Sequence, residues 1–465
     1  MNLKIVAEIY LAALVVFIIY FVGMLSQDKV FDQKGGLHKG WLVVHCVVLL
    51  LVFVGAAIKT SNKLEENTNN TAKFDAIHKE IKDITASIDH PPVLSKLENI
   101  AKEMGLSLDD VFARLEKGLD FDKGLKALLQ GRYDDAVNLF GKHAKKNKKQ
   151  AAQSYFYRGN AFALKRDYER AVEAYQQSAV LDPKYSYTWN NWAISLRQLG
   201  RYNEAIEKYE EAVKHKPENT YALYNWANLL AHLNRHPEAI EKFEMASKIH
   251  PQDADVWYNW GISLAELGEH KKATEKYEQA VKFKPDHVSA WYNWGNSLAE
   301  QGNHEEAIDK YEEAVKYAPN FASAWFNYGL SLFELRRYEE AIQKYQKAVE
   351  YNPAHAEALY NWGNILMILS NGKDKTKLME AIEKYKMAIK YEPHHSRAWH
   401  NFGSTLALLG NCEDAIEMYK MALKYEPDYP SAWLGLIECL KSLGRNKDAQ
   451  KKIDDAKKKG VKLTI

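Results

Sequence analysis

The sequence predicts an all-α protein: an α-solenoid of about ten helix-turn-helix units, preceded by a two-helix transmembrane hairpin. Two observations carry this prediction. Prolines recur at intervals of 34 residues over much of the chain, and two long apolar runs stand near the N-terminus. Because the composition changes sharply near residue 60, the chain divides into residues 1–60, 61–119 and 120–465.

The first part, residues 1–60, predicts a transmembrane hairpin. Residues 5–25 form an apolar run with one early charge, Glu8, and about 20 such residues are needed to cross a bilayer as a helix. Residues 41–58 form a second run without formal charge. The polar segment between the runs is too short for a domain, so both chain ends lie on one side of the membrane. Lysines at those ends outnumber the lysines of the loop only four to three, so charge does not settle the side of the membrane, and the cytoplasmic side is the one expected for the repeats.

Alternatives stay open within this hairpin. A cleaved signal peptide is the alternative for the first run, although the run is longer than a typical signal segment and no A-x-A site follows it. His45 and Cys46 lie inside the second run. They are either a ligand or metal site, since polar groups are costly in a membrane, or helix-packing residues near the interface.

The second part, residues 61–119, predicts a polar tether followed by amphipathic helices. Five apolar residues before Pro91 are spaced 3-4-3-4, so they share one seam of a helix. The seam favours either a short coiled coil with self-association, or a helix that packs on the repeats or the membrane surface. Residues 93–119 are expected to form a helical cap. The seam residues are Phe74, Ile77, Ile81, Ile84 and Ile88.

The third part, residues 120–465, repeats one unit. In the unit that begins at Ala290, Trp294 and Gly295 fall on one face of a first helix, Gly302 ends that helix, and Pro319 precedes the next unit. One longer interval adds six residues in SNGKDKTK, which we expect in the turn between two helices. The prolines are Pro183, Pro217, Pro251, Pro285, Pro319, Pro353, Pro393 and Pro427.

The unit length, the helix-turn-helix pattern and the motif W-x2-[WL]-G-x2-L, A-x3-[YF]-x2-A, P resemble the tetratricopeptide-repeat (TPR) family over residues 120–463. The resemblance implies a right-handed superhelix whose extended concave surface binds a protein or peptide partner. The family's pattern for capturing chaperone C-termini needs Lys and Arg where this chain has Asn190 and Tyr224, so such ligands are disfavoured.

Enzymatic and nucleic-acid-binding functions are not expected. The chain contains no GxxxxGK[ST], GxSxG, HExxH or GxGxxG motif, so we predict neither catalysis nor a cofactor. The 63 basic and 61 acidic side chains nearly cancel and are mixed along the chain, which argues against nucleic acid. Cys46, Cys412 and Cys439 include no CxxC pair, so no zinc site or disulfide framework is predicted.

An asparagine precedes an aromatic residue in the first helix of seven units. Asparagine is a mediocre helix former, so this repetition needs a physical reason. Ser289, Asn293 and Asn296 share a stripe that is predicted to line the concave face. The array is similar to the asparagine ladder of the O-GlcNAc transferase repeat domain and of armadillo importins, which implies contacts with the backbone of an extended peptide. The ladder is Asn191, Asn225, Asn259, Asn293, Asn327, Asn361 and Asn401.

The ladder is also compatible with hydrogen bonds between adjacent repeats, or with simple inheritance by repeat duplication. Helix spacing of about 8–10 Å against about 3.4 Å per extended residue gives one rung for roughly every third ligand residue. The aromatic residues beside the ladder either grip the ligand or only pack; they are Tyr224, Tyr258, Tyr292, Phe326 and Tyr360. Specificity is expected from Asn228, Asn296, Asn364, Glu357 and Arg397. His394 and His395 are expected to face solvent.

Together these patterns predict a membrane-anchored TPR scaffold. The lipid bilayer is contacted through residues 5–58, and a protein or extended peptide binds the concave face. Two further functions stay open. One is a substrate-recruiting subunit of a separate membrane-associated enzyme complex, and the second is a coat that assembles on a membrane.

Overall fold

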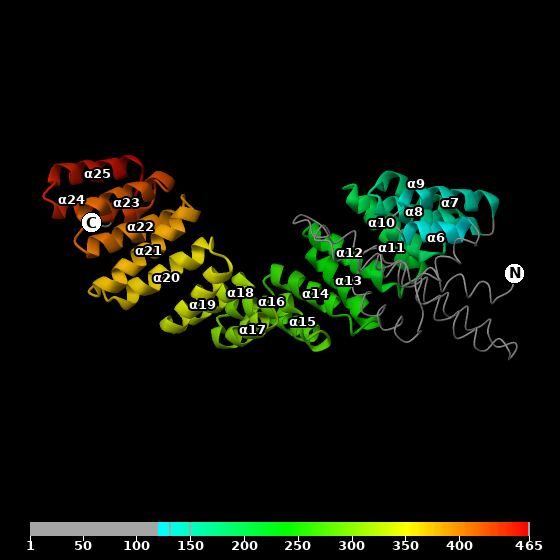
Figure 1. Ribbon diagram of the computed structural model, residues 1–465, viewed down its shortest axis with the longest axis horizontal. Helices are drawn as coiled ribbons and strands as arrows, with labels where there is room; N and C mark the ends of the chain where they lie inside the picture. Colours follow the sequence, from blue (N-terminus) through cyan, green and yellow to red (C-terminus); the bar gives the residue numbers. More distant parts are fainter. Residues whose placement is uncertain (1–119, 130–131, 148–149, 464–465) are drawn as a thin grey trace. The chain divides into compact units, whose positions relative to one another are not determined.

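The computed structural model describes residues 120–129, 132–147 and 150–463, and Figure 1 shows them as successive helices. These residues contain no strand. The chain divides into two compact units, Met1–Pro251 and Gln252–Ile465, which we call unit 1 and unit 2 and describe separately. The division falls at Pro251, one of the prolines that mark the repeats, so it separates whole repeats.

The helices alternate along each unit. Unit 1 contains α6 (Asp120–Leu129), α7 (Tyr133–Lys146), α8 (Ala151–Leu164), α9 (Tyr168–Leu181), α10 (Ser186–Gln198), α11 (Tyr202–His215), α12 (Thr220–His232) and α13 (His236–Ile249). Unit 2 contains α14 (Ala254–Glu266), α15 (His270–Phe283), α16 (Val288–Glu300), α17 (His304–Tyr317), α18 (Ala322–Glu334), α19 (Tyr338–Tyr351), α20 (Ala356–Leu369), α21 (Lys375–Tyr391), α22 (Ser396–Leu408), α23 (Cys412–Tyr425), α24 (Pro430–Ser442) and α25 (Asn446–Lys458).

Each repeat is a pair of helices packed against each other, and we call the first the A helix and the second the B helix. The pairs run from α6 with α7 to α24 with α25, which agrees with the expected number of about ten units. Neighbouring A helices also pack directly, as α8 does with α10 and α14 with α16. No pair of B helices in the described residues packs as closely. Each unit therefore curves with its A helices on the concave side.

In the core of each repeat, a small residue of the A helix packs against a large residue of the B helix. At Gly295 in α16, an added Cβ would lie 2.6 Å from the Cε1 atom of Tyr311 in α17, so only glycine leaves room for the ring. Tyr311 is 1% exposed. Gly302 ends the A helix with a φ of +79°, a left-handed conformation that favours glycine. A small residue thus stands where the two helices of this repeat approach most closely.

A tryptophan in the first turn of several A helices fixes the loop before it. The Trp291 indole N–H donates to the carbonyl oxygen of Pro285 at 2.8 Å, which satisfies a ring donor and a loop acceptor together. The regular prolines thus mark a hydrogen-bonded corner as well as a helix stop. The same bond joins Trp189 to Pro183, Trp325 to Pro319, Trp399 to Pro393 and Trp433 to Pro427.

The six additional residues of the longer repeat lie only partly in the turn, contrary to the expectation. The A helix α20 has 14 residues where α18 has 13, and the B helix α21 has 17 where α19 has 14. Four of the six residues therefore extend the helices. Asp374 accounts for the longer B helix, because its carboxylate caps α21 by accepting from the backbone N–H groups of Thr376 and Lys377.

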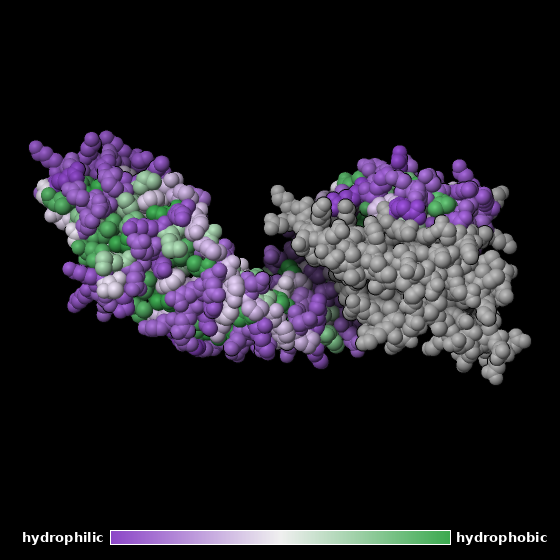
Figure 2. Space-filling view, viewed as in Figure 1, coloured by the Kyte–Doolittle hydropathy of each residue, from purple (hydrophilic) through white to green (hydrophobic). Residues whose placement is uncertain are grey.

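The predicted transmembrane hairpin, with runs at 5–25 and 41–58, lies outside the described residues, as does the predicted tether and coiled-coil segment at 61–119. In the part of the chain that the structure describes, no helix is both long enough and apolar enough to cross a membrane. Figure 2 shows the visible surface of unit 2 as small apolar patches separated by hydrophilic side chains.

Candidate peptide-binding face

The ladder asparagines lie on the A helices, but they are more buried than an open binding surface would have them. Asn191 and Asn225 in unit 1 are 0% and 1% exposed. The five ladder asparagines of unit 2 are half-buried. The structure therefore divides the ladder into a fully covered part and a part whose carboxamides reach solvent.

Most of these carboxamides make hydrogen bonds between neighbouring repeats. The Asn327 Nδ2 group donates to the Asn296 Oδ1 atom at 2.8 Å and to the Tyr292 hydroxyl at 3.0 Å, both in the preceding repeat. Asn296 Oδ1 also accepts from the Tyr311 hydroxyl at 2.8 Å. One carboxamide oxygen thus joins both helices of its own repeat to the next repeat.

The same arrangement occurs in two further places. In one, the acceptor is Asn364 Oδ1, which takes bonds from the Asn401 Nδ2 group at 2.7 Å and from the Tyr385 hydroxyl at 2.9 Å. In the second, Asn160 Oδ1 accepts from Asn191 at 3.1 Å and from Tyr175 at 2.7 Å. Burial raises the pKa of the Tyr385 hydroxyl well above its usual value, so it stays a donor across the physiological pH range.

Three other ladder asparagines donate to different kinds of acceptor. Asn293 donates to the Tyr258 hydroxyl at 3.2 Å, because Ile262 stands where an asparagine acceptor would be. Asn225 donates to Asn190 Oδ1 at 3.3 Å. Asn259 donates to a backbone carbonyl of its own helix at 2.8 Å. Hydrogen bonds between repeats, one of the roles predicted for the ladder, therefore occur at most rungs.

Asn361 is the exception. Its half-buried carboxamide makes no hydrogen bond with any described residue. The preceding repeat accounts for this, since it has Phe326 where most neighbouring repeats have a tyrosine hydroxyl and Leu330 where alternate repeats have an asparagine. The repeat before Asn361 thus lacks both the tyrosine hydroxyl and the asparagine oxygen that accept hydrogen bonds elsewhere in the ladder.

The acceptor position, three residues after each ladder asparagine, alternates between two chemistries. In consecutive repeats it holds an asparagine and then a branched aliphatic residue. Because the two kinds alternate, the chemical period of the A-helix face is two repeats rather than one. The series starts at Asn160, in the repeat before the ladder, continues with Ile194, Asn228, Ile262, Asn296, Leu330 and Asn364, and the alternation ends at Ser404, three residues after Asn401.

The aromatic residues beside the ladder pack within the solenoid. Tyr292 lies between the ring of Tyr311, with centroids 6.1 Å apart, and Phe321 of the following repeat, at 4.9 Å. In the same way, Tyr258 contacts Tyr277 and His287, and Tyr360 contacts Tyr385 and His395. Tyr224 contacts Phe243 at 6.2 Å. These aromatics are half-buried, so their packing role is observed and their contact with a ligand stays a prediction.

His395 does not face solvent as expected. It is 8% exposed and caps α22, because its Nδ1 atom accepts from the Ala398 backbone N–H at 3.3 Å. Its Nε2 atom lies 3.4 Å from a Glu357 carboxylate oxygen, with Glu392 nearby. Since Nδ1 accepts, the ring proton lies on Nε2 and blocks the lone pair that a metal needs. The three side chains therefore form a helix cap with an acidic partner.

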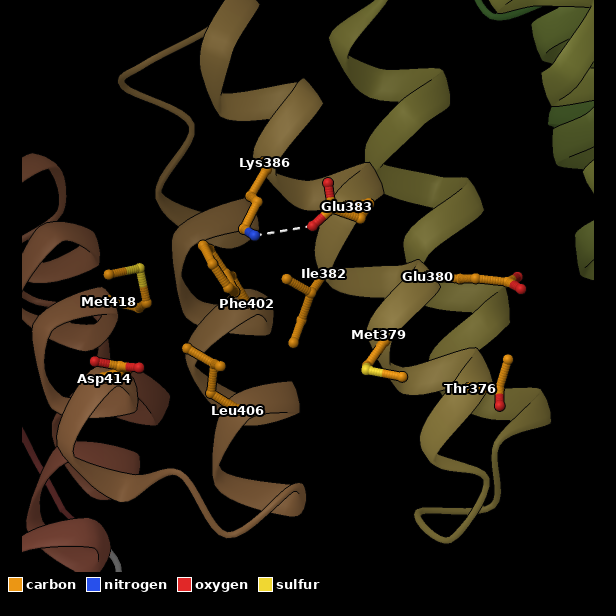
Figure 3. Close-up of a pocket in the computed structure, with 10 residues that line it drawn as sticks. All are labelled: Thr376, Met379, Glu380, Ile382, Glu383, Lys386, Phe402, Leu406, Asp414 and Met418. Carbon is orange, nitrogen blue, oxygen red and sulfur yellow. Dashed lines mark hydrogen bonds and ion pairs between the residues drawn. The ribbon is translucent and has the colours of Figure 1, made fainter.

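An apolar groove of about 650 Å³ lies between the B helices α21 and α23, over the A helix α22 (Figure 3). In six preceding repeats, a lysine of the B helix lies over a tryptophan or tyrosine of the A helix, as Lys310 does over Trp294 at 4.5 Å. The equivalent pair here is Phe402 and Met418. The groove exists because the phenylalanine ring is smaller than tryptophan and the methionine carries no charged group to cover it. Helical geometry places the groove on the side of α22 away from Asn401.

Sequence reasoning missed a row of acidic residues on the ladder stripe. Glu266, Glu300 and Glu334 each follow a ladder asparagine by seven residues, which is two helical turns, and all three are exposed. The signal was in the sequence. The predicted stripe extended only four residues back and three residues forward from each asparagine, and one further turn reaches the glutamates.

Repeated pairs of packed helices define a helical-repeat solenoid as the class of this chain. The model of the tetratricopeptide repeat matches residues 121–186, 190–254, 258–316, 292–356 and 329–371, and a second tetratricopeptide-repeat model matches residues 406–462. These matches cover more than half of the sequence. The chain belongs to the tetratricopeptide-repeat family.

Three solved structures are similar to parts of the chain. The crystal structure of MamA is 22% identical, covers 37% of this chain and 94% of its own, and has a TM-score of 0.35. YrrB, described as a TPR protein with an unusual peptide-binding site, is 24% identical over 42% of this chain and 98% of its own, with a TM-score of 0.37. A TPR protein from Cytophaga hutchinsonii is 15% identical over 60% and 99%, with a TM-score of 0.41. The comparison with curated protein sequences gives no match.

Proposed function

We propose that this protein is a membrane-anchored scaffold whose A-helix face holds an extended segment of another polypeptide. The observation that carries the proposal is the unpaired carboxamide of Asn361. A half-buried amide without a protein partner loses hydrogen bonds with water and gains none in return, which costs free energy. The backbone of an extended ligand supplies both the donor and the acceptor that this side chain lacks.

The remaining rungs are compatible with the same role. In Asn327 and Asn401 the Nδ2 group holds the neighbouring repeat, and both side chains are only half-buried. Each such carboxamide is fixed in orientation by the protein, so a ligand that binds it finds the polar group already ordered. Repeats that are about 8–10 Å apart then meet an extended chain at roughly every third residue.

The binding test uses Asn361→Ala in the full chain, with peptides selected from a random library for binding to the wild-type protein. Loss of two hydrogen bonds, at about 0.5–1.5 kcal/mol each, should lower the affinity at least about fivefold, as measured by fluorescence anisotropy. Gln301→Ala is the matched control, because this side chain bonds only a carbonyl of its own helix at 2.8 Å. Equal affinities of wild type and Asn361→Ala for every selected peptide would refute the proposed role.

The anchor is tested by extraction of membranes with alkaline carbonate. Two apolar runs of this length, at 5–25 and 41–58, should keep the full chain in the membrane pellet, and deletion of residues 1–60 should release it. Recovery of the full chain in the supernatant would show that the runs do not span the bilayer. The repeats would then be a scaffold without this anchor.

A further inference from the structure

The A helices of unit 2 differ in charge from the B helices beside them. The first five A helices, from α14 to α22, contain no lysine, and Arg397 is their one guanidinium. They carry five carboxylates, on Asp255, Glu266, Glu300, Glu334 and Glu357. The B helices of the same repeats contain many lysines, five of them in α21 alone. The B helices carry as many carboxylates as lysines and so have no net charge, whereas these A helices have five carboxylates against one guanidinium, which leaves net negative charge on the concave side of this unit.

Three of these carboxylates form a row without internal partners. Glu266, Glu300 and Glu334 occupy the same position of successive A helices, on the stripe that carries the ladder. Among the described residues, none of the three forms an ion pair. Some glutamates of the B helices do form ion pairs, as Glu313 does with Lys316 at 2.9 Å and Glu340 with Arg337 at 2.7 Å. The row is thus free to meet a positive ligand.

A second observation, independent of charge, points to a ligand at the end of this row. The Tyr345 side chain is 0% exposed, and its hydroxyl has no hydrogen-bond partner. In the repeats on either side, the equivalent hydroxyls of Tyr311 and Tyr385 donate to an asparagine on the ladder stripe. Tyr345 is directed at the same position, where Leu330 offers no acceptor. Glu334 is close enough to contribute to the raised pKa of Tyr345, although burial is the larger cause.

Because Tyr311 and Asn327 share the Asn296 oxygen, the equivalent groups of Tyr345 and Asn361 are expected to face one position, that of Leu330. Both are donors that lack the single acceptor oxygen which serves their equivalents elsewhere. A carbonyl oxygen of an extended peptide has the chemistry that is missing. With Glu334 next to this position, the residue whose carbonyl binds there is best matched by a basic side chain.

Beyond the glutamates, the same position becomes aliphatic. In the next two A helices it holds Ile368, which is 42% exposed, and Leu408, which is 52% exposed. A ligand that covered these two side chains would remove apolar surface from water, which is favourable. The stripe thus presents three acidic positions followed by two apolar positions, one in each repeat.

Resting on the proposed function, we infer that unit 2 binds an extended peptide with three basic residues at every third position, followed by two aliphatic residues at the same spacing. Each basic side chain faces one of Glu266, Glu300 and Glu334, and the aliphatic side chains cover Ile368 and Leu408. The backbone carbonyl near the third basic residue accepts from Tyr345 and Asn361. The spacing of three requires the peptide to bind in the polyproline II conformation, in which three residues span about 9 Å and every third side chain points the same way, and this span matches the distance of about 8–10 Å between helices.

The probe is the fluorescent peptide Lys-Ser-Thr-Lys-Ser-Thr-Lys-Ser-Thr-Leu-Ser-Thr-Leu, used in both chain directions against the full-length protein. A peptide of the same composition with adjacent lysines, and one with glutamate in place of lysine, are the peptide controls. The spaced lysine peptide should bind at least about tenfold more tightly than either control in one of its directions, and its affinity should fall as salt is raised. Equal affinity for all of these peptides overturns the inference.

Protein variants locate the contact. Glu266→Gln, Glu300→Gln and Glu334→Gln together should lower the affinity for the spaced peptide at least about fivefold. The same change in charge on the B helices, with Glu275→Gln, Glu306→Gln and Glu339→Gln, should leave it within about twofold. All six side chains are exposed, so folding is retained and is checked by circular dichroism. A loss of equal size in both variants shows attraction by total charge and refutes the inference.

Asn361→Ala separates this inference from the proposed function. Asn361→Ala could lower the affinity for the library-selected peptides while the triple glutamate variant lowers the affinity for no peptide. The face would then bind peptides without the basic pattern, and only the inference would fail. If Asn361→Ala weakens no peptide, the proposed binding face itself is wrong.

Discussion

Replacement of Tyr311 by alanine should lower the free energy of unfolding by about 3–5 kcal/mol, the range for removal of a buried aromatic ring. The ring is 1% exposed and fills the space above Gly295, and its hydroxyl donates to Asn296 at 2.8 Å. Its removal leaves a cavity at a junction where two repeats share a core. Denaturant unfolding of the full chain measures the loss, and hydrogen exchange should place it in α16 to α18, because a solenoid repeat contacts only its neighbours.

Tyr317 provides the matched control in the same helix. It is 41% exposed, so Tyr317→Ala should change stability by less than about 0.5 kcal/mol. Tyr311→Phe keeps the ring and removes one hydrogen bond, and it should cost about 0.5–1.5 kcal/mol. Similar small losses for all three variants would mean that the ring of Tyr311 does not fill the core as described.

Alanine at two rungs of the ladder should have different effects on stability, a clear loss at Asn191 and almost no change at Asn361. Asn191 is 0% exposed, donates to Asn160 and accepts from Asn190, so Asn191→Ala leaves polar groups unpaired in the core. The expected cost is about 1–3 kcal/mol. Asn361 has no such partner, so Asn361→Ala should stay within about 0.5 kcal/mol of the wild type.

Thermal unfolding of the two variants side by side is the measurement. Alanine is a better helix former than asparagine by a few tenths of a kcal/mol, which reduces the loss at Asn191 and favours the variant at Asn361. A loss of more than about 1 kcal/mol for Asn361→Ala would reveal a structural role for this carboxamide. The unpaired group could then no longer support the proposed binding face.

The repeat architecture was predictable because the two helices of every repeat pack through residues at the same positions. The small position at Gly295 and the large one at Tyr311 recur at one spacing, so pattern alone identifies the two helices and their contact faces. The longer repeat shows the limit of this reasoning. Insertions are expected in turns, but Asp374 caps a helix, and the lysines after it extend that helix.

The partners of the ladder were not predictable to the same degree. Helical periodicity places Asn327 and Asn361 on one stripe, but it does not say which residue of the preceding repeat each one reaches. The partner depends on how far neighbouring A helices are shifted along their axes. This shift places each ladder asparagine opposite two positions of the preceding repeat, which for Asn361 are Phe326 and Leu330. Once this is known, the unpaired state of Asn361 follows from the sequence.

The alternation of asparagine with isoleucine or leucine at the acceptor position limits how a bound chain can move along the solenoid. A ligand displaced by one repeat brings the groups that faced Asn296 to Leu330, so its polar contacts are lost together. Displacement by two repeats brings the same groups to Asn364, so the acceptor pattern alone would permit steps of roughly six ligand residues. The row of three glutamates does not repeat in this way, because Ile368 and Leu408 follow it, so a peptide with the inferred basic pattern would be held in one register.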